Sequence, residues 1–255
     1  MKRLGILTPS SNTVLEPETA RLAAPLAASL SVHVARFRVT RIAPDAGSDE
    51  QFDLAPMLEA ASLLADARVD TLLWSGTSAA WLGLDADRDL VAAIEGETGI
   101  PATTSTLALL DAFAGLGVRR YGLVVPYVDE IADAIVRNLE AEGYECTART
   151  AESVTTNWAF AEIGPATIAE RARSIAASRP DAIVVHCTNL RGAAIVEELE
   201  DELGIPVLDS VVVGLWGALR LLHLGVPSRG FGRLAGAGPR DATSPRDAAA
   251  VTARG

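Results

Sequence analysis

Residues 69–83 read VDTLLWSGTSAAWLG, which is an apolar run, a Gly-Thr-Ser turn and the start of a helix, and residues 180–194 repeat this plan as PDAIVVHCTNLRGAA. Two further segments recur: ETGIPATT (97–104) as ELGIPVLD (202–209), and RLGILTPSSN (3–12) as RYGLVVPYVD (120–129). All of these repeats occur at similar offsets, which are far longer than the period of a solenoid. We therefore interpret them as two copies of one α/β lobe.

Short Val, Leu and Ile runs bounded by Pro, Gly or Ser alternate with Ala-, Leu-, Glu- and Arg-rich segments of helical period. This pattern predicts strands at residues 3–8, 31–37, 69–74, 101–103, 120–125, 145–149, 181–185 and 207–208. Continuous apolar runs such as AIVV indicate strands that are buried on both faces and paired in parallel. The predicted fold class is α/β, with two pseudo-symmetric lobes, each a parallel sheet flanked by helices, and an active site in the cleft between them.

The repeats also predict how the chain is divided. We expect lobe 1 to contain residues 1–115 and 205–235, with the chain crossing back near Gly204 to complete the first sheet, and lobe 2 to contain residues 116–204. Residues 236–255 contain Pro, Gly and charged residues but no apolar face, so we expect a disordered tail.

Composition narrows the function classes. The 255 residues, 49% of them hydrophobic, are enough for a substantial core. A net charge of −11 argues against a nucleic-acid or anionic-membrane partner, and no stretch approaches membrane-spanning length. Two distant cysteines and three scattered histidines provide neither a disulfide framework nor metal-ligand spacing. We expect a cytoplasmic protein and allow for a homo-oligomer.

The repeats place chemically different residues at equivalent strand ends. Aligning Asp70 with Asp181 pairs Gly76 with Cys187, Thr77 with Thr188 and Ser78 with Asn189, and the other repeat pairs Ser10 with Tyr127. Ligands of parallel α/β sheets bind beyond the carboxyl ends of the strands. One lobe therefore offers a thiol to the cleft where the other lobe offers no side chain.

Several motifs occur in a recognisable order. These are PSSNT (9–13), the Gly-Thr-Ser of 76–78, a tyrosine after Pro126, Cys187 after a strand, and GFGRL (230–234). As a set they resemble the aspartate/glutamate racemase superfamily, and within it most of all the arylmalonate decarboxylases and the maleate cis-trans isomerases. The resemblance covers roughly residues 3–234. It implies an enzyme without cofactor or metal, with a small carboxylate or dicarboxylate substrate, that stabilises a planar enediolate beside a carboxylate.

Two signals within this resemblance conflict. Racemases and isomerases of the superfamily generally carry a cysteine at both facing positions, whereas its decarboxylases resemble this chain in having Gly-Thr-Ser at one and cysteine at the other. PSSNT looks more like the isomerases, whose asparagine at the position of Asn12 contacts the substrate carboxylate. We give more weight to the facing pair Gly76 and Cys187, which favours decarboxylation. The alternatives are maleate isomerase or racemase activity through Cys187 and a non-cysteine partner, or a binding protein that recognises a carboxylate without catalysis.

The chemistry supports the same preference. Racemisation by two bases needs a proton-transferring group on each face of the carbon, and Gly76 provides none, whereas decarboxylation needs only one proton donor. Cys187 would be that donor, with its pKa lowered by a following helix N-terminus. We expect the enediolate to be bound by the hydroxyls of Thr77, Ser78 and Tyr127 and by backbone N–H groups around Gly76 and Thr188. The full set of expected substrate-binding residues is Ser10, Asn12, Thr77, Ser78, Tyr127, Asn157, Thr188 and Asn189.

The remaining candidates have structural interpretations. Cys146 is expected to be structural, and His186 to point away from the cleft because side chains alternate along a strand. The tryptophans are expected in the core or in pocket walls: Trp74, Trp81, Trp158 and Trp216. We expect residues 42–52 and 79–82 to shape the pocket.

Overall fold

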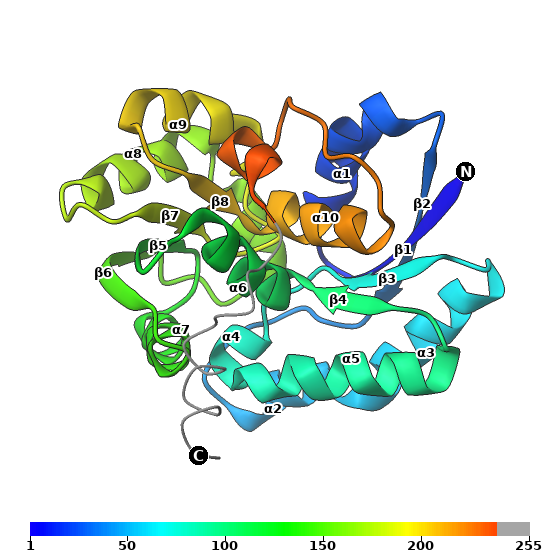
Figure 1. Ribbon diagram of the computed structural model, residues 1–255. Coiled ribbons are helices and arrows are strands. Elements are labelled where there is room, and N and C mark those ends of the chain that lie inside the picture. Colours follow the sequence, from blue (N-terminus) through cyan, green and yellow to red (C-terminus); the bar gives the residue numbers. More distant parts are fainter. Residues whose placement is uncertain (239–255) are drawn as a thin grey trace, which may run out of the picture.

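The structure, a computed structural model, describes residues 1–238 (Figure 1). Within them lie two four-stranded sheets, ordered β2-β1-β3-β4 and β6-β5-β7-β8. The strands are β1 (Lys2–Pro9), β2 (Leu30–Phe37), β3 (Thr71–Trp74), β4 (Ala102–Thr104), β5 (Arg120–Val125), β6 (Glu145–Ala151), β7 (Ala182–Val185) and β8 (Val207–Asp209). All neighbouring strands pair in parallel. Each expected strand is present, and the α/β class with two parallel sheets is confirmed.

Helices fill the crossovers. The α-helices are α1 (Leu15–Ala23), α2 (Ala46–Asp49), α3 (Leu54–Asp66), α4 (Ala79–Leu82), α5 (Leu84–Thr98), α6 (Ser105–Leu116), α7 (Asp129–Ala141), α8 (Pro165–Ala176), α9 (Val196–Leu203) and α10 (Ser210–Leu221). Short 3-10 helices are η1 (Ala24–Leu26), η2 (Glu50–Phe52), η3 (Asn157–Glu162), η4 (Ala193–Ile195) and η5 (Gly232–Gly236). Helices α3 and α5 cover one face of the first sheet, and α10 lies over β3 and β4 on the other (Figure 1).

The duplication extends to individual hydrogen bonds. Asp70 precedes β3, and its Oδ2 accepts from the backbone N–H of Arg3 (2.7 Å). Asp181 precedes β7, and its Oδ2 accepts from the backbone N–H of Arg120 (2.8 Å). The repeated aspartate thus ties each lobe's first strand to its neighbour in the same way.

The expectation that the chain returns near Gly204 to complete the first sheet is wrong. Strand β8 pairs with β7 in the second sheet, from Ile183↔Val207 to Val185↔Asp209. This follows from the repeat, since β8 occupies in its lobe the place that β4 occupies in the first. The following helix does cross over: α10 packs on α6, β3 and β4. Phe113 of α6, in turn, contacts the Tyr121 ring of β5 at 5.6 Å between centroids.

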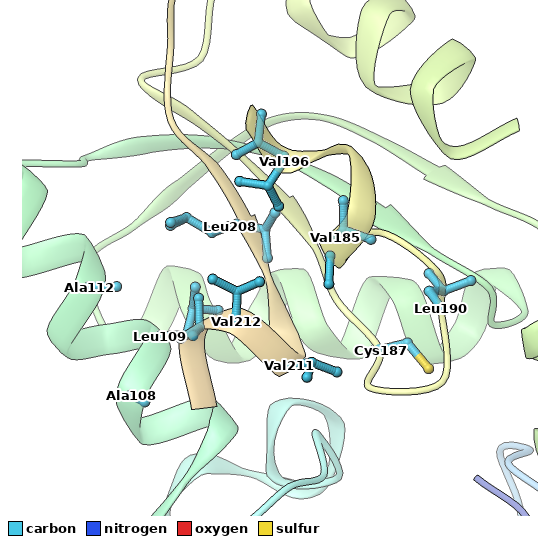
Figure 2. Close-up of a cluster of buried hydrophobic side chains, with 14 of the residues drawn as sticks. Ala108, Leu109, Ala112, Val185, Cys187, Leu190, Val196, Leu208, Val211 and Val212 are labelled. Carbon is cyan, nitrogen blue, oxygen red and sulfur yellow. The ribbon is translucent and has the colours of Figure 1, made fainter. Parts of the chain in front are cut away.

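These crossing helices give the two lobes a common core. One cluster of buried apolar side chains includes Leu4 and Leu73 of the first sheet together with Leu123 and Val184 of the second. Figure 2 shows part of it, with Leu109 and Ala112 of α6 beside Val212 of α10. Burying each Leu or Val contributes about 1.5–3 kcal/mol. The strand ends of the two lobes are therefore held in a fixed relation.

The last described segment is anchored by carboxylates of α9. Oε1 of Glu197 accepts from the N–H of Gly230 (2.7 Å), and Oε2 of Glu200 accepts from the N–H of Arg233 (2.7 Å). Of the tail expected at 236–255, residues 239–255 lie outside the described residues. No helix in residues 1–238 is long and apolar enough to cross a bilayer.

Candidate active site

Cys187 follows β7, is 3% exposed, and lines a cavity to which both lobes contribute. The other lining residues are Pro9, Ile42, Phe52, Trp74, Gly76, Thr77, Trp81, Tyr127, Asn157 and Thr188. The structure thus brings six of the predicted site residues together: Gly76, Thr77, Tyr127, Asn157, Cys187 and Thr188. The cavity volume is ≈ 10 Å³, room for about one water molecule, so a substrate must displace part of the lining.

The Cys187 thiol is held in its protonated form. Burial raises its pKa to about 12, and the nearby Asp209 carboxylate adds to the rise. The Tyr127 hydroxyl and the backbone N–H of Asn189, 3.4 Å from Sγ, act in the opposite direction but do not compensate. The expectation of a lowered pKa is wrong because a loop, rather than a helix N-terminus, follows Cys187. In Figure 2 the sulfur points away from Val211 and Val212.

Two hydroxyls meet across the lobes near the thiol. The Tyr127 hydroxyl and Oγ1 of Thr77 lie 3.0 Å apart. Burial raises the pKa of Tyr127 well above its ordinary value, so its hydroxyl remains protonated. Its ring is held edge-on by Trp81 (5.2 Å) and Phe160 (5.3 Å). The pair therefore places two hydroxyls on the wall of the cavity, one of which donates to the other.

Asn12 ties the lobes together outside the cavity. Its Nδ2 donates to the carbonyl oxygen of Thr188 (3.2 Å) and to Thr188 Oγ1 (3.1 Å). Its Oδ1 accepts from the backbone N–H groups of Val14 (3.0 Å) and Leu15 (2.9 Å) at the start of α1. The amide is thus occupied with positioning Thr188, and the predicted substrate contact of Asn12 stays a prediction.

Asn189 makes a matching connection from the second lobe. Its Oδ1 accepts from the N–H of Thr13 (3.0 Å), and its Nδ2 donates to the carbonyl oxygen of Asn157 (2.6 Å). The Asn157 Nδ2 then donates to Ser11 Oγ (2.8 Å). These amides form a buried network that joins the first helix to the loop after β7.

We expect Asn12→Ala to lower the free energy of unfolding by about 2–4 kcal/mol, because it removes the acceptor for the N–H groups of Val14 and Leu15 and the donors to Thr188. Asn12→Asp keeps the capping oxygen but loses the donors, and should be intermediate. Ser10→Ala is the matched control, expected within about 0.5 kcal/mol of the wild type. Urea unfolding measures the free energy of unfolding of all three variants. A wild-type value for Asn12→Ala would contradict the structural role given to this amide.

Like Asn12 and Asn189, two further predicted site residues do not line the Cys187 cavity. Ser10 is exposed, and its Oγ hydrogen-bonds only with the backbone of Val39, at 3.3 and 3.5 Å. Ser78 precedes α4 and lines a second cavity of ≈ 210 Å³. Phe52, Leu54, Met57, Leu82, Ala86, Asp87, Asp89 and Leu90 also line this cavity. Phe52 lines both cavities.

The residues given structural interpretations lie largely as expected. Cys146 is on β6, where its Sγ donates to the Ala148 carbonyl oxygen (3.5 Å). Neither ring nitrogen of His186 has a hydrogen-bond partner, and burial lowers its pKa to about 4. Neither residue lines the cavity. Among the tryptophans, Trp158 corrects the expectation, because it is 55% exposed rather than part of the core or a pocket wall.

Asp209 is a buried carboxyl that no motif singles out. Its Oδ1 accepts from the N–H groups of Val211 (2.9 Å) and Val212 (3.3 Å), whereas Oδ2 has no partner. Burial raises its pKa to about 7. The sequence feature that could have identified Asp209 is the repeat, which aligns this acid with Thr104 of the first lobe. Within residues 1–238 no group of three or more His, Cys, Asp or Glu side chains could hold a metal ion.

Comparison with known proteins places this geometry in context. The arylmalonate decarboxylase family model matches residues 5–235. Maleate isomerase of Nocardia farcinica (strain IFM 10152) is 31% identical over 244 residues, covering 92% of this chain and 95% of that protein.

Two solved structures share the fold over nearly their whole length. One is maleate cis-trans isomerase of Nocardia farcinica, a cysteine-to-serine mutant with a covalently bound succinylcysteine intermediate (TM-score 0.83, 28% identity, 92% of this chain and 98% of that one). The other is a liganded arylmalonate decarboxylase carrying a glycine-to-cysteine and a cysteine-to-serine change (TM-score 0.81, 25% identity, 92% and 98%). The resemblance to the aspartate/glutamate racemase superfamily is confirmed. Since the proteins it matches are decarboxylases and isomerases, this chain is an enzyme and belongs to the arylmalonate decarboxylase family.

Proposed function

We propose that this enzyme decarboxylates a malonate that carries an apolar substituent at C2, without a cofactor, and that Cys187 protonates the product carbon. The observation that carries this proposal is the composition of one cavity: a single thiol, held protonated, with Gly76 at the equivalent position of the other lobe. Such a site has one proton donor, which is what decarboxylation requires.

The proposed reaction has two steps. The bond from C2 to one carboxylate breaks, CO₂ leaves, and the electron pair delocalises over C2 and the remaining carboxylate as an enediolate. The Cys187 S–H then gives its proton to C2, and the resulting thiolate recovers a proton from water. The Thr77 and Tyr127 hydroxyls, 3.0 Å apart, are the proposed donors to the enediolate oxygens. Fixed donors of this kind stabilise developing charge strongly in a water-excluded site.

The related proteins support a distinction between one-thiol and two-thiol chemistry. The maleate isomerase mutant carries its intermediate on a cysteine although another cysteine has been changed to serine. The arylmalonate decarboxylase mutant carries changes at a glycine and a cysteine, the same pair of residue types that faces this cavity. The second cysteine of this chain, Cys146, lies on β6 outside the cavity. A two-thiol mechanism therefore lacks its second thiol.

The neighbouring cavity supports an apolar substituent. Its ≈ 210 Å³ are lined largely by apolar side chains, among them Leu54, Met57 and Leu90. Phe52, on the short helix η2, lines both this cavity and the cavity of Cys187. Movement of this ring would join the two spaces. An aryl or alkenyl group could then occupy the larger space while the carboxylates remain near Cys187.

Maleate isomerisation is the second candidate, because identity to a maleate isomerase extends over 92% of the chain. It would require another group to act where the second cysteine is missing. Among the cavity residues, the hydroxyls of Thr77 and Tyr127 are the available protic groups.

A substrate panel in D₂O tests the proposal. We expect 2-aryl- and 2-alkenylmalonates to yield CO₂ and a monoacid with one deuteron at C2, in the presence of a chelator and with no cofactor added. Gas release and mass spectrometry measure the two products. Conversion of maleate to fumarate without CO₂ would favour the second candidate. If calorimetry shows tight carboxylate binding but neither the malonates nor maleate are turned over, both candidate functions are contradicted.

A further inference from the structure

Trp74 and Gly76 compete for one space at the end of β3. Side chains two residues apart on a strand point to the same face. The indole of Trp74 folds over Gly76, so that a β-carbon built there would lie 2.0 Å from Cζ2 and 2.4 Å from Cε2. The backbone of Gly76 does not have a positive φ. Glycine is therefore needed at this position because of the space that the indole occupies, and not for its backbone conformation.

The second lobe uses the same two positions differently. The repeat aligns Trp74 with Val185 and Gly76 with Cys187. Val185 is small and leaves room for the Cys187 side chain two residues later. The first lobe thus fills with an indole the space that the second lobe gives to a thiol.

The indole also carries an unused hydrogen-bond donor. Trp74 is 1% exposed, lines the Cys187 cavity, and its Nε1 has no hydrogen-bond partner. A buried N–H without a partner is costly, so it favours an arriving acceptor. Its ring is fixed by Phe37, with centroids 5.1 Å apart.

We propose that Trp74 determines the specificity of this enzyme in two ways. Its indole covers the face of the reacting carbon opposite Cys187, and its N–H binds an oxygen of a substrate carboxylate. Protons then reach the carbon only from the Cys187 side, and a prochiral 2-substituted malonate gives one enantiomer of the monoacid. The stereochemical part rests on the proposed decarboxylation; the packing and the N–H contact do not.

The packing is tested by a double-mutant cycle of thermal stability. Gly76→Cys should lower the melting temperature by several degrees because its β-carbon overlaps the indole. Trp74→Val reproduces the arrangement of the second lobe, so the double variant Trp74→Val/Gly76→Cys should recover most of the loss. Gly96→Cys is the matched control, since a β-carbon at Gly96 meets nothing within 4 Å. Additive losses in the double variant would overturn the packing argument.

The N–H contact is tested by malonate binding, which needs no turnover. Trp74→Phe keeps an aromatic ring but removes the donor, and calorimetry should show about tenfold weaker binding of malonate. Trp216→Phe, a tryptophan buried in α10 outside the cavity, should bind malonate as the wild type does. Undiminished binding by Trp74→Phe would overturn the contact.

The stereochemical role is read from chiral products. The wild type should give one enantiomer, and Trp74→Val a product of lower optical purity. Trp74→Val/Gly76→Cys, with a thiol on each face, should exchange the C2 hydrogen of the isolated monoacid in D₂O and racemise it. Unchanged optical purity in both variants would overturn the role of Trp74. If no malonate is decarboxylated by the wild type, the proposed function fails, while the stability and binding experiments still decide the packing and the contact.

Discussion

Cys187→Ser is expected to lower the turnover of substituted malonates by about 10²–10⁴-fold, the usual contribution of a positioned general acid. A serine hydroxyl is similar in size to the thiol but is a far weaker acid. The melting temperature should change little, because a serine Oγ can accept the backbone N–H of Asn189 as Sγ does. Steady-state CO₂ release and thermal unfolding, measured on the same preparation, separate the two effects.

Cys146→Ser is the matched control for this substitution. Cys146 is half-buried on β6 and does not line the cavity, so its replacement should leave turnover unchanged. Full activity in Cys187→Ala would remove the thiol from the mechanism.

The pH dependence gives an independent measure of the same group. The pKa of Cys187 is raised from 9.0 to about 12, so the acid form persists through neutral pH. A rate that depends on the thiol should therefore fall only on the alkaline side. The corresponding contribution to stability is present below pH 9 and is lost as pH rises toward 12. A rate that increases with pH through the alkaline range would instead indicate a nucleophilic thiolate.

The sequence predicts the strands of this fold because two local signals agree. The apolar runs are bounded by turn residues, and each run is supported by a second copy at an equivalent place. The same repeat contains the information that β8 belongs to the second sheet, since ELGIPVLD is the counterpart of ETGIPATT. The packing of α10 on β3 and β4 is not predictable from local sequence, because the apolar pattern of a helix does not specify which lobe it packs against.

The candidate site is predictable in its residue types but less so in its contacts. Strand-end position identifies Gly76, Thr77, Tyr127 and Cys187, all of which line one cavity. It does not show that the amide of Asn12 is occupied by Thr188. That arrangement depends on the packing of two segments far apart in the chain.

The protonation state of the thiol is the clearest case of information absent from the sequence. A cysteine at a strand end is compatible with a lowered or a raised pKa, and the sign depends on what surrounds it. Here the enclosure by both lobes, rather than a helix N-terminus, determines the sign. The competition between the Trp74 ring and a side chain at Gly76 is likewise visible only when the rotamer of the indole is known.

Tyr127→Phe is expected to lower kcat by about 10²–10³-fold, the typical cost of removing one donor to a developing oxyanion. The substitution removes the hydroxyl that lies 3.0 Å from Thr77 Oγ1 and keeps the ring against Trp81. Tyr121→Phe is the matched control, because Tyr121 is equally buried in the same lobe but outside the cavity, and its kcat should be unchanged. Thr77→Val should weaken catalysis similarly, and the double variant should lose less than the product of the single losses, since the two hydroxyls act as a pair. Fully multiplicative losses would mean that each hydroxyl works alone, and an unchanged kcat in Tyr127→Phe would remove the pair from the site.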